Sequence, residues 1–239
     1  MKVIGFDTAT DDTVVAAIDG EQTVSERALP PGDRRPVHSQ ALLELIDEAA
    51  AALGGWKEVD RIAVGIGPGT FTGIRIGVAT AAGLAASTGV PVVGVSTLDA
   101  LARSILGRTR DMGAVMPLID ARRGEVFGSL NDEKGRPTGE PFVCGPEALV
   151  DRLRDAAGSG QAPFAAGPGA VRFRDELLRA GLEIAPAEST VHRLAGRPIC
   201  DLGASAAKTG PETLEPLYLR VPDAQLWLER DGKTDDRNP

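Results

Sequence analysis

The beginning of the chain consists of short apolar runs separated by polar segments, a pattern that is typical of β-strands joined by turns. Residues 2–6 and 13–18 are rich in Val, Ile and Ala, and a polar segment of turn-forming residues separates them. Asp19-Gly20 has the composition of a type I′ hairpin turn, so residues 21–28 are expected to return as a third strand. The pattern therefore predicts an antiparallel three-stranded meander.

After this meander the apolar spacing changes from that of strands to that of helices. Between His38 and Leu53, apolar side chains recur every three or four residues and acidic residues occupy the other side, which predicts a helix. Alternating elements follow: strands at 61–66 and 91–95, and helices at 73–87 and from the capping-box sequence Ser96-Thr-Leu-Asp99 to about Gly107.

The second half of the chain partly repeats this scheme. Strands are predicted at 114–120, 124–130 and near 136–143, and helices at 146–157 and near 172–180 and 199–207. We therefore divide the chain into two related lobes, residues 1–107 and 108–228, and the last helix is able to pack back on the first lobe. Residues 229–239 have no apolar pattern and are expected to be a disordered tail.

A meander that passes into alternating helices and strands, and does so twice, resembles the architecture of the actin, sugar-kinase and Hsp70 (ASKHA) superfamily. The expected fold class is therefore α/β, two-lobed and actin-like. In that fold an acidic residue at the first hairpin tip, here Asp7, faces the phosphates of a ligand between the lobes. The alternative, which we favour, is that the Asp7 carboxylate accepts hydrogen bonds from nearby backbone N–H groups.

The segment that connects the strand at 61–66 with the next helix is rich in glycine. Gly67, Pro68 and Gly69 shape a tight backbone turn, and Thr70 lies beside the free N–H groups of the new helix. The segment lacks the third glycine of G-x-G-x-x-G and the lysine of G-x-x-x-x-G-K-[ST]. Two interpretations of this segment remain open: a loop that binds a phosphate group, called a phosphate cradle below, and a loop that packs the helix tightly on the sheet. If it is a cradle, the candidate nucleotide- or phosphate-facing residues are Asp7, Thr8, Gly67, Gly69 and Thr70.

Composition and charge narrow the classes of function. A net charge of −8 argues against a stand-alone nucleic-acid binder, which needs a concentrated basic face. We expect a cytoplasmic protein with no membrane partner, since the chain has neither a signal peptide nor a long apolar run.

Cys144 and Cys200 are far apart in the sequence, which favours buried free thiols. No catalytic triad or zinc-protease motif is present, so no catalytic residue is predicted.

Five short motifs follow one another along the chain: Phe6-Asp-Thr-Ala-Thr10, His38-Ser-Gln-Ala-Leu-Leu43, Gly67-Pro-Gly-Thr-Phe-Thr-Gly-Ile-Arg-Ile-Gly77, Asp120-Ala-Arg-Arg-Gly-Glu-Val-Phe127 and Pro216-Leu-Tyr-Leu-Arg220. Together they resemble the TsaB (YeaZ) family over nearly the whole chain. The resemblance implies a non-catalytic subunit that binds and activates TsaD, the sister subunit that transfers threonylcarbamoyl to the adenosine beside the anticodon of tRNA. It also implies the ATPase subunit TsaE as a partner, and contact with tRNA only through the complex.

The sister subunit holds a metal through an H-x-x-x-H pair, and this chain departs from that pattern. His38 is followed four residues later by Leu42, so one of the two ligands is missing. We therefore predict no metal site and no firmly bound cofactor. The resemblance leaves open weak binding of ATP or ADP with Mg²⁺ at the cleft between the lobes or at a subunit interface.

The helix that follows Gly73 is apolar almost all the way round and therefore needs a cover on two sides. We predict that it forms, with the helix His38–Leu53, a docking face shared by a homodimer and by the heterodimer with TsaD. Replacing Val78 or Leu45 by Arg is expected to abolish docking without unfolding the monomer. The predicted interface residues are His38, Leu42, Leu45, Ile46, Ala49, Ile74, Gly77, Val78 and Ala81.

Two rival functions belong to other classes. The first is a small-molecule kinase of the same superfamily, in which Asp7 and the glycine loop would act on ATP. The second is a dimeric scaffold with no part in RNA modification. Titration with Mg-ATP tests the first, and reconstitution of the tRNA modification tests the second.

Overall fold

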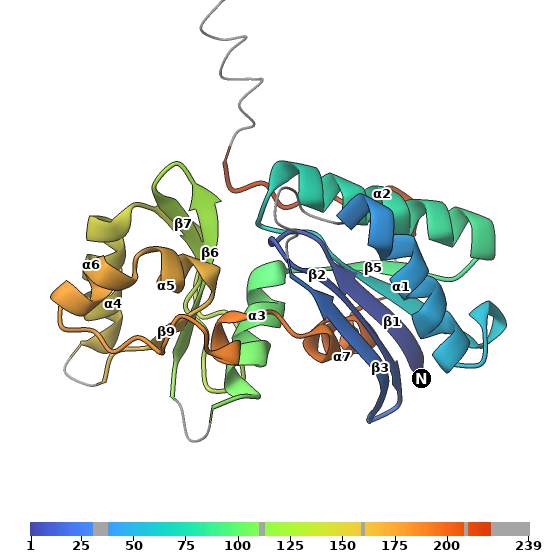
Figure 1. The fold of residues 1–239 in the computed structure, drawn as a ribbon, viewed down its shortest axis with the longest axis horizontal. Coiled ribbons are helices and arrows are strands. Elements are labelled where there is room, and N and C mark those ends of the chain that lie inside the picture. The colour runs from blue at the N-terminus through green and yellow to red at the C-terminus, as the bar shows by residue number, and fades with distance from the viewer. Residues whose placement is uncertain (31–37, 110–112, 159–160, 208–209, 221–239) are drawn as a thin grey trace, which may run out of the picture.

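The computed structural model describes residues 1–30, 38–109, 113–158, 161–207 and 210–220. Two β-sheets are each covered by helices, and helix α3 (Thr97–Leu106) lies between them (Figure 1). The expected tail at 229–239 lies outside the described residues. Among the described residues, no helix is both long and apolar enough to span a bilayer.

The first sheet has the strand order β3-β2-β1-β4-β5. Its first three strands form the predicted meander, since β1 pairs antiparallel with β2 and β2 with β3, whereas β4 and β5 add in parallel. The strands are β1 (Lys2–Asp7), β2 (Thr13–Asp19), β3 (Gln22–Leu29), β4 (Arg61–Gly65) and β5 (Val92–Val95).

Helices cover both faces of this sheet because successive strand residues point to opposite sides. Along β1, Ile4 and Phe6 pack with the helices α1 (His38–Ala52) and α2 (Phe71–Thr88). Val3 packs on the other side, in a core that includes α3 and α7 (Gly196–Ser205). This second core also contains side chains of the second sheet, so the two lobes share one apolar interior through α3.

The second sheet has the strand order β8-β7-β6-β9, with β6 and β9 parallel. Its strands are β6 (Val115–Arg122), β7 (Glu125–Gly128), β8 (Phe142–Cys144) and β9 (Phe164–Ala166). One face packs against α3 and the other against α4 (Pro146–Ala157), α5 (Pro168–Arg172) and α6 (Arg174–Arg179). Short 3₁₀ turns complete the fold at η1 (Trp56–Glu58), η2 (Thr190–His192) and η3 (Pro211–Thr213).

Three elements of the second lobe differ from the prediction. The strand expected near 136–143 is confined to Phe142–Cys144, because Pro137 and Pro141 cannot donate to a strand ladder. Strand β9 was not predicted, since three residues are too few to show a period. The helix expected near 172–180 is α6, and the short helix α5 that precedes it was not predicted.

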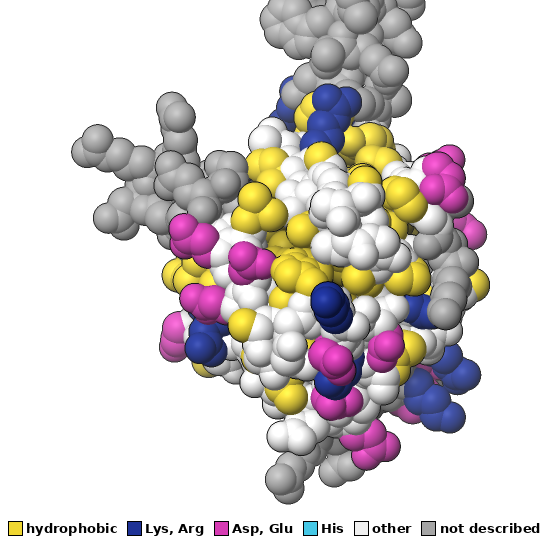
Figure 2. Space-filling model, turned by 90° about the vertical axis from the view of Figure 1, so that its right-hand side faces the viewer, with side chains coloured by type: hydrophobic (Ala, Val, Ile, Leu, Met, Phe, Trp, Pro, Cys, Tyr) yellow, Lys and Arg dark blue, Asp and Glu magenta, His cyan; other side chains and the backbone are white. Residues whose placement is uncertain are grey.

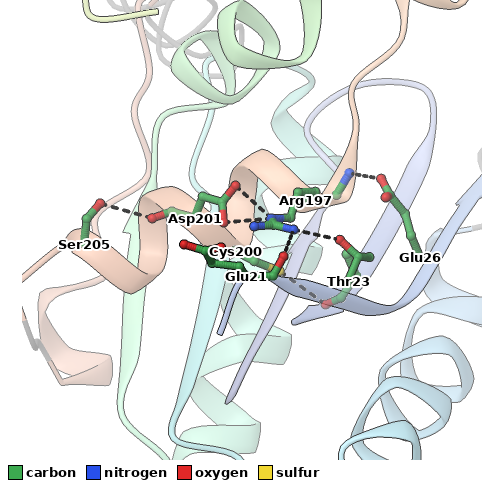
Figure 3. A network of polar contacts seen from close by, with 9 residues as sticks. Glu21, Thr23, Glu26, Arg197, Cys200, Asp201 and Ser205 are labelled. Atoms are coloured by element: carbon green, nitrogen blue, oxygen red, sulfur yellow. Dashed lines mark hydrogen bonds and ion pairs between the residues drawn. The ribbon is translucent and has the colours of Figure 1, made fainter. Parts of the chain in front are cut away.

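Helix α7 belongs late in the sequence but lies on the first sheet, and both of its ends are held by side chains of that sheet. At its start, the Glu26 carboxylate accepts the Gly196 N–H at 2.6 Å. Arg197 in the first turn donates to Asp201 at 2.8 Å and to the Glu21 carbonyl at 2.6 Å (Figure 3). The negative group at the N-terminus suits the helix dipole.

The C-terminal end of α7 is capped by the guanidinium of Arg61, the first residue of β4. Its Nη1 donates to the carbonyl of Gly203 at 2.6 Å and to that of Ala206 at 2.7 Å. Arg61 is buried, and it supplies donors to carbonyls that have no partner inside the helix. The sequence reasoning missed this role because nothing near Arg61 in the chain indicates a helix end.

Candidate functional site

Asp7 ends strand β1 and is completely buried. Its Oδ2 accepts a hydrogen bond from the Thr97 hydroxyl at 2.7 Å, and its Oδ1 accepts the Ala9 N–H at 2.7 Å. The Thr97 hydroxyl oxygen in turn accepts the Gly67 N–H at 3.2 Å. Burial raises the pKa of the Asp7 carboxyl to about 6, although these hydrogen bonds act in the opposite direction.

The glycine loop is packed tightly against the β1–β2 tip. A Cβ on Gly65 would lie 1.7 Å from Oδ2 of Asp7, and one on Gly69 would lie 2.2 Å from the Ala9 carbonyl oxygen. Thr8 is buried, and its hydroxyl donates to the Gly73 carbonyl at 2.7 Å. Side chains are excluded here because the Asp7 carboxylate and the backbone of Thr8 and Ala9 fill the space, which favours the packing interpretation of the loop over the phosphate cradle.

The N-terminus of α2 is closed by its own cap. The hydroxyl of Thr70 accepts the Gly73 N–H at 3.3 Å, so one of the free helix donors already has a partner. Of the five candidate phosphate-facing residues, Asp7, Thr8 and Gly67 are buried, and Gly69 and Thr70 are half-buried. The structure brings all five together, but it leaves only the last two partly open to solvent.

Most of the side chains predicted for the docking face are instead part of the core of the first lobe. Their apolar side packs on strand residues of the first sheet such as Ile4, Phe6 and Ile62. Leu45 is only 9% exposed, so an arginine there would enter the core, contrary to the expectation that the monomer would stay folded. Val78 is half-buried, and the side chain of His38 lies outside what the structure describes. The buried members are Leu42, Leu45, Ile46, Ala49, Ile74, Gly77 and Ala81.

Other residues of the same two helices form the surface that a partner can reach. On α1, Leu43 is 59% exposed, and the acidic side chains of Glu44, Asp47 and Glu48 on the same helix are exposed as well. On α2 the exposed row runs through Ala79 and Ala86 and starts at Phe71. Figure 2 shows hydrophobic side chains gathered over this face, with charged side chains around them. We call these exposed residues the outer face of α1 and α2.

An aromatic cluster stands at one end of this outer face. The rings of Phe71 and Tyr218 lie with centroids 5.4 Å apart. The guanidinium of Arg75 stacks 3.8 Å from the centroid of Phe71, and its Nε donates to the Tyr218 hydroxyl at 3.3 Å. The motif 216–220 thus joins α2, a contact that the sequence reasoning did not anticipate.

The described residues contain no group of three or more His, Cys, Asp or Glu side chains placed to hold a metal ion. His192 is buried, its Nδ1 accepts the Gly167 N–H at 3.1 Å, and its Nε2 faces the Ala185 carbonyl at 3.3 Å. Both ring nitrogens are therefore used to join loops of the second lobe. Cys144 and Cys200 are free and buried, as the sequence predicts.

Known proteins that are similar to this chain belong to the class that makes threonylcarbamoyladenosine on tRNA. A family model described as "TsaD: tRNA N6-adenosine threonylcarbamoyltransferase" matches residues 29–213. The TsaB protein of tRNA threonylcarbamoyladenosine biosynthesis from Escherichia coli is 32% identical over 98% of this chain and 100% of that protein. The Haemophilus influenzae TsaB is 35% identical over 65% of this chain and 69% of that protein.

Solved structures agree with this result. YeaZ from Pseudomonas aeruginosa superimposes with a TM-score of 0.71 at 26% identity, and the match covers 91% of this chain and 99% of that chain. A second P. aeruginosa structure, described as similar to peptidase YEAZ, has a TM-score of 0.73 at 27% identity and covers 92% of this chain and 99% of that one. The chain belongs to the TsaB (YeaZ) family, whose named members take part in threonylcarbamoyladenosine synthesis on tRNA.

Proposed function

We propose that this chain is a non-catalytic partner subunit of the tRNA N6-threonylcarbamoyladenosine synthase, and that it binds and activates the catalytic sister subunit TsaD. Family membership supports the pathway. The observation that carries the non-catalytic role is the packing of the first lobe: Asp7 and Thr8 are buried and hydrogen-bonded to the chain itself. The polar groups that an actin-like enzyme would turn toward a ligand are already engaged.

Reconstitution tests this proposal directly. Purified TsaD and TsaE are assayed for threonylcarbamoyl transfer to tRNA with and without this chain, and the chain is also assayed alone. Transfer is expected to depend on the chain, while the chain alone transfers nothing. Transfer by TsaD and TsaE at the same rate without it, or transfer by the chain alone, contradicts the proposal.

The outer face of α1 and α2 is the surface we propose for docking. It combines an exposed leucine, Leu43, and an exposed aromatic ring, Phe71, with small residues that let another helix approach closely. A homodimer and the heterodimer with TsaD would use this one face, and the two would therefore compete. TsaE would join the assembled pair, and tRNA would contact the complex rather than this acidic chain alone.

We further propose that residues 1–107 and 108–228 are the two lobes of an actin-like fold and that the protein works in the cytoplasm. Weak binding of ATP or ADP with Mg²⁺ at the lobe cleft or at a subunit interface is compatible with this architecture. Titration of Mg-ATP into the isolated chain distinguishes the rival kinase function, since micromolar binding with turnover would favour the kinase.

A peptidase activity has no support among the described residues. The chain has two histidines, and His192 is buried with both ring nitrogens in contact with the backbone. A general base has to reach the proton that it removes, and this imidazole is closed off from any substrate.

A further inference from the structure

The outer face of α1 and α2 carries an unbalanced set of charges. The two helices contain three acidic side chains and one arginine, and their sequences have no lysine. All four charged side chains are exposed, namely Glu44, Asp47 and Glu48 on α1 and Arg75 on α2. The same face exposes apolar surface, since Leu43 is 59% and Phe71 39% exposed. A partner that covers this face therefore has to match acidic as well as apolar side chains.

The carboxylates of α1 repel one another within the helix. Glu44 and Glu48 are four positions apart, so they lie on the same side of α1 as a like-charge pair. The positions three and four residues away from either of them hold no Lys or Arg. Asp47 differs from them, because its Oδ1 accepts a hydrogen bond from Nε1 of Trp56 at 2.9 Å. A cation supplied by a partner opposite Glu44 and Glu48 would relieve the repulsion.

The one guanidinium on these two helices is already engaged at the far end of the face. Arg75 stacks 3.8 Å from the ring centroid of Phe71, and its Nε donates to the Tyr218 hydroxyl at 3.3 Å. Moving it to a carboxylate of another chain would break both contacts. A second copy of this chain therefore presents acidic side chains on α1 and an occupied arginine on α2.

A contact between two copies through this face would be symmetric, so that each copy contributes the same patch. The contact would gather the α1 carboxylates of both copies, and each whole chain has a net charge of −8. Like charges that meet in an interface cost free energy and slow the encounter of the two chains. Natural interfaces use such repulsion to exclude wrong partners.

We propose that the carboxylates of α1 make the outer face select a partner with Lys or Arg side chains opposite α1 over a second copy of this chain. The inference rests on the proposed function, in which TsaD is that partner. It adds two statements: the TsaD surface that meets α1 is basic, and charge decides the competition between heterodimer and homodimer.

The test compares two associations of the full chain at different salt concentrations. Sedimentation equilibrium gives the Kd of the homodimer, and titration calorimetry with purified TsaD gives the Kd of the heterodimer. Raising NaCl from about 0.05 to 0.5 M shortens the Debye length from about 14 to about 4 Å. The homodimer is expected to tighten about two- to fivefold and the heterodimer to weaken by a similar factor, because screening removes a repulsion from one and an attraction from the other.

The variant Glu44→Gln/Glu48→Gln removes the two charges and keeps the size of the side chains. At about 0.05 M salt it should tighten the homodimer and weaken the heterodimer, each about two- to fivefold, and both salt dependences should become smaller. The matched control is Asp151→Asn/Asp155→Asn, whose carboxylates are also exposed and four positions apart but lie on α4. It changes the net charge by the same amount and should leave both Kd values nearly unchanged.

The outcomes separate this inference from the proposed function. Equal homodimer association of the parent and Glu44→Gln/Glu48→Gln, including none in either chain, would overturn the inference, as would an equally tight heterodimer. Effects of the same size in the α4 control would also overturn it, because net charge alone would then be the cause. If TsaD does not bind the parent chain, the proposed function is wrong, and the homodimer measurements still decide whether these carboxylates oppose self-association.

Discussion

The hydroxyl of Thr97 donates a hydrogen bond to the carboxylate of Asp7 at 2.7 Å, and neither residue is exposed to solvent. Thr97 is the first residue of α3, and its N–H donates to the Gly67 carbonyl at 2.8 Å. The pair therefore joins the end of β1, the glycine loop and the start of the helix between the lobes. A buried carboxylate without a cation is costly when charged, which makes Asp7 a sensitive point of the fold.

Replacing Asp7 by Asn should stabilise the protein at neutral pH. The folded-state pKa of Asp7 is about 6 and its ordinary value is 3.8, so the fold prefers the protonated form. Its contribution to stability is greatest below pH 4 and is lost as the pH rises through 6, by up to about 3 kcal/mol. The free energy of unfolding in urea should therefore be higher for Asp7→Asn than for the parent at pH 7.

The pH dependence of this difference is the decisive observation. The advantage of Asp7→Asn should shrink between pH 7 and pH 4.5, because the parent carboxyl becomes protonated. Asp151→Asn, at an exposed position of α4, serves as the control and should change stability little at either pH. An advantage that is equal at both pH values would show that charge burial is not the cause.

Two glycines of α2 should respond in opposite ways to the same change. A Cβ on Gly73 would lie 1.9 Å from the Thr8 carbonyl oxygen, whereas Gly83 has nothing within 4 Å. Gly73→Ala should cost at least about 1–3 kcal/mol, since backbone must move, and Gly83→Ala should gain about 0.5–1 kcal/mol through helix propensity. Thermal or urea denaturation of the two variants measures this. A stable Gly73→Ala variant would mean that the β1–β2 tip is not packed on the loop as described.

Docking should be lost when a charge is placed on the outer face of α2. Ala79 is exposed, so Ala79→Arg is expected to leave the monomer folded and to weaken co-purification with TsaD at least tenfold, because the partner cannot solvate a buried guanidinium. Ala156→Arg, on the exposed side of α4, is the matched control. Circular dichroism verifies folding of both. Undiminished binding by Ala79→Arg would rule out this face.

Removal of the Arg61 guanidinium should loosen α7. Arg61→Met keeps the apolar part of the side chain but leaves the Gly203 and Ala206 carbonyls without their donor, at an expected cost of about 1–3 kcal/mol. Hydrogen exchange in α7 should accelerate more than in α1. Arg27→Met, at an exposed position of β3, should have no such effect. Equal hydrogen-exchange rates in α7 of the parent and of Arg61→Met would show that Arg61 does not stabilise the end of this helix.

Much of the secondary structure could be predicted from local patterns. The meander, the strand β4 and the helices α1 to α3 follow from apolar periodicity and from the caps at Thr70 and Ser96. Most of the residues predicted to form the docking surface are buried instead. The sequence of an amphipathic helix shows which side is apolar, but it does not distinguish a side that packs on the protein's own sheet from one that packs on a partner. Leu42 and Ile46 face the sheet, and Leu43 faces outward.

The sequence by itself determined the order of many of the elements, the family motifs and the presence of Leu42 four residues after His38, since these depend on residues close together in the chain. The tertiary structure alone decided that Asp7 is buried beneath Thr97, that Arg61 caps α7, and that Arg122 reaches Asp11 across the lobes. Each of these contacts joins residues at least 90 positions apart. Local propensity carries no information about such pairs, because the chain brings them together only when distant elements pack on the sheets.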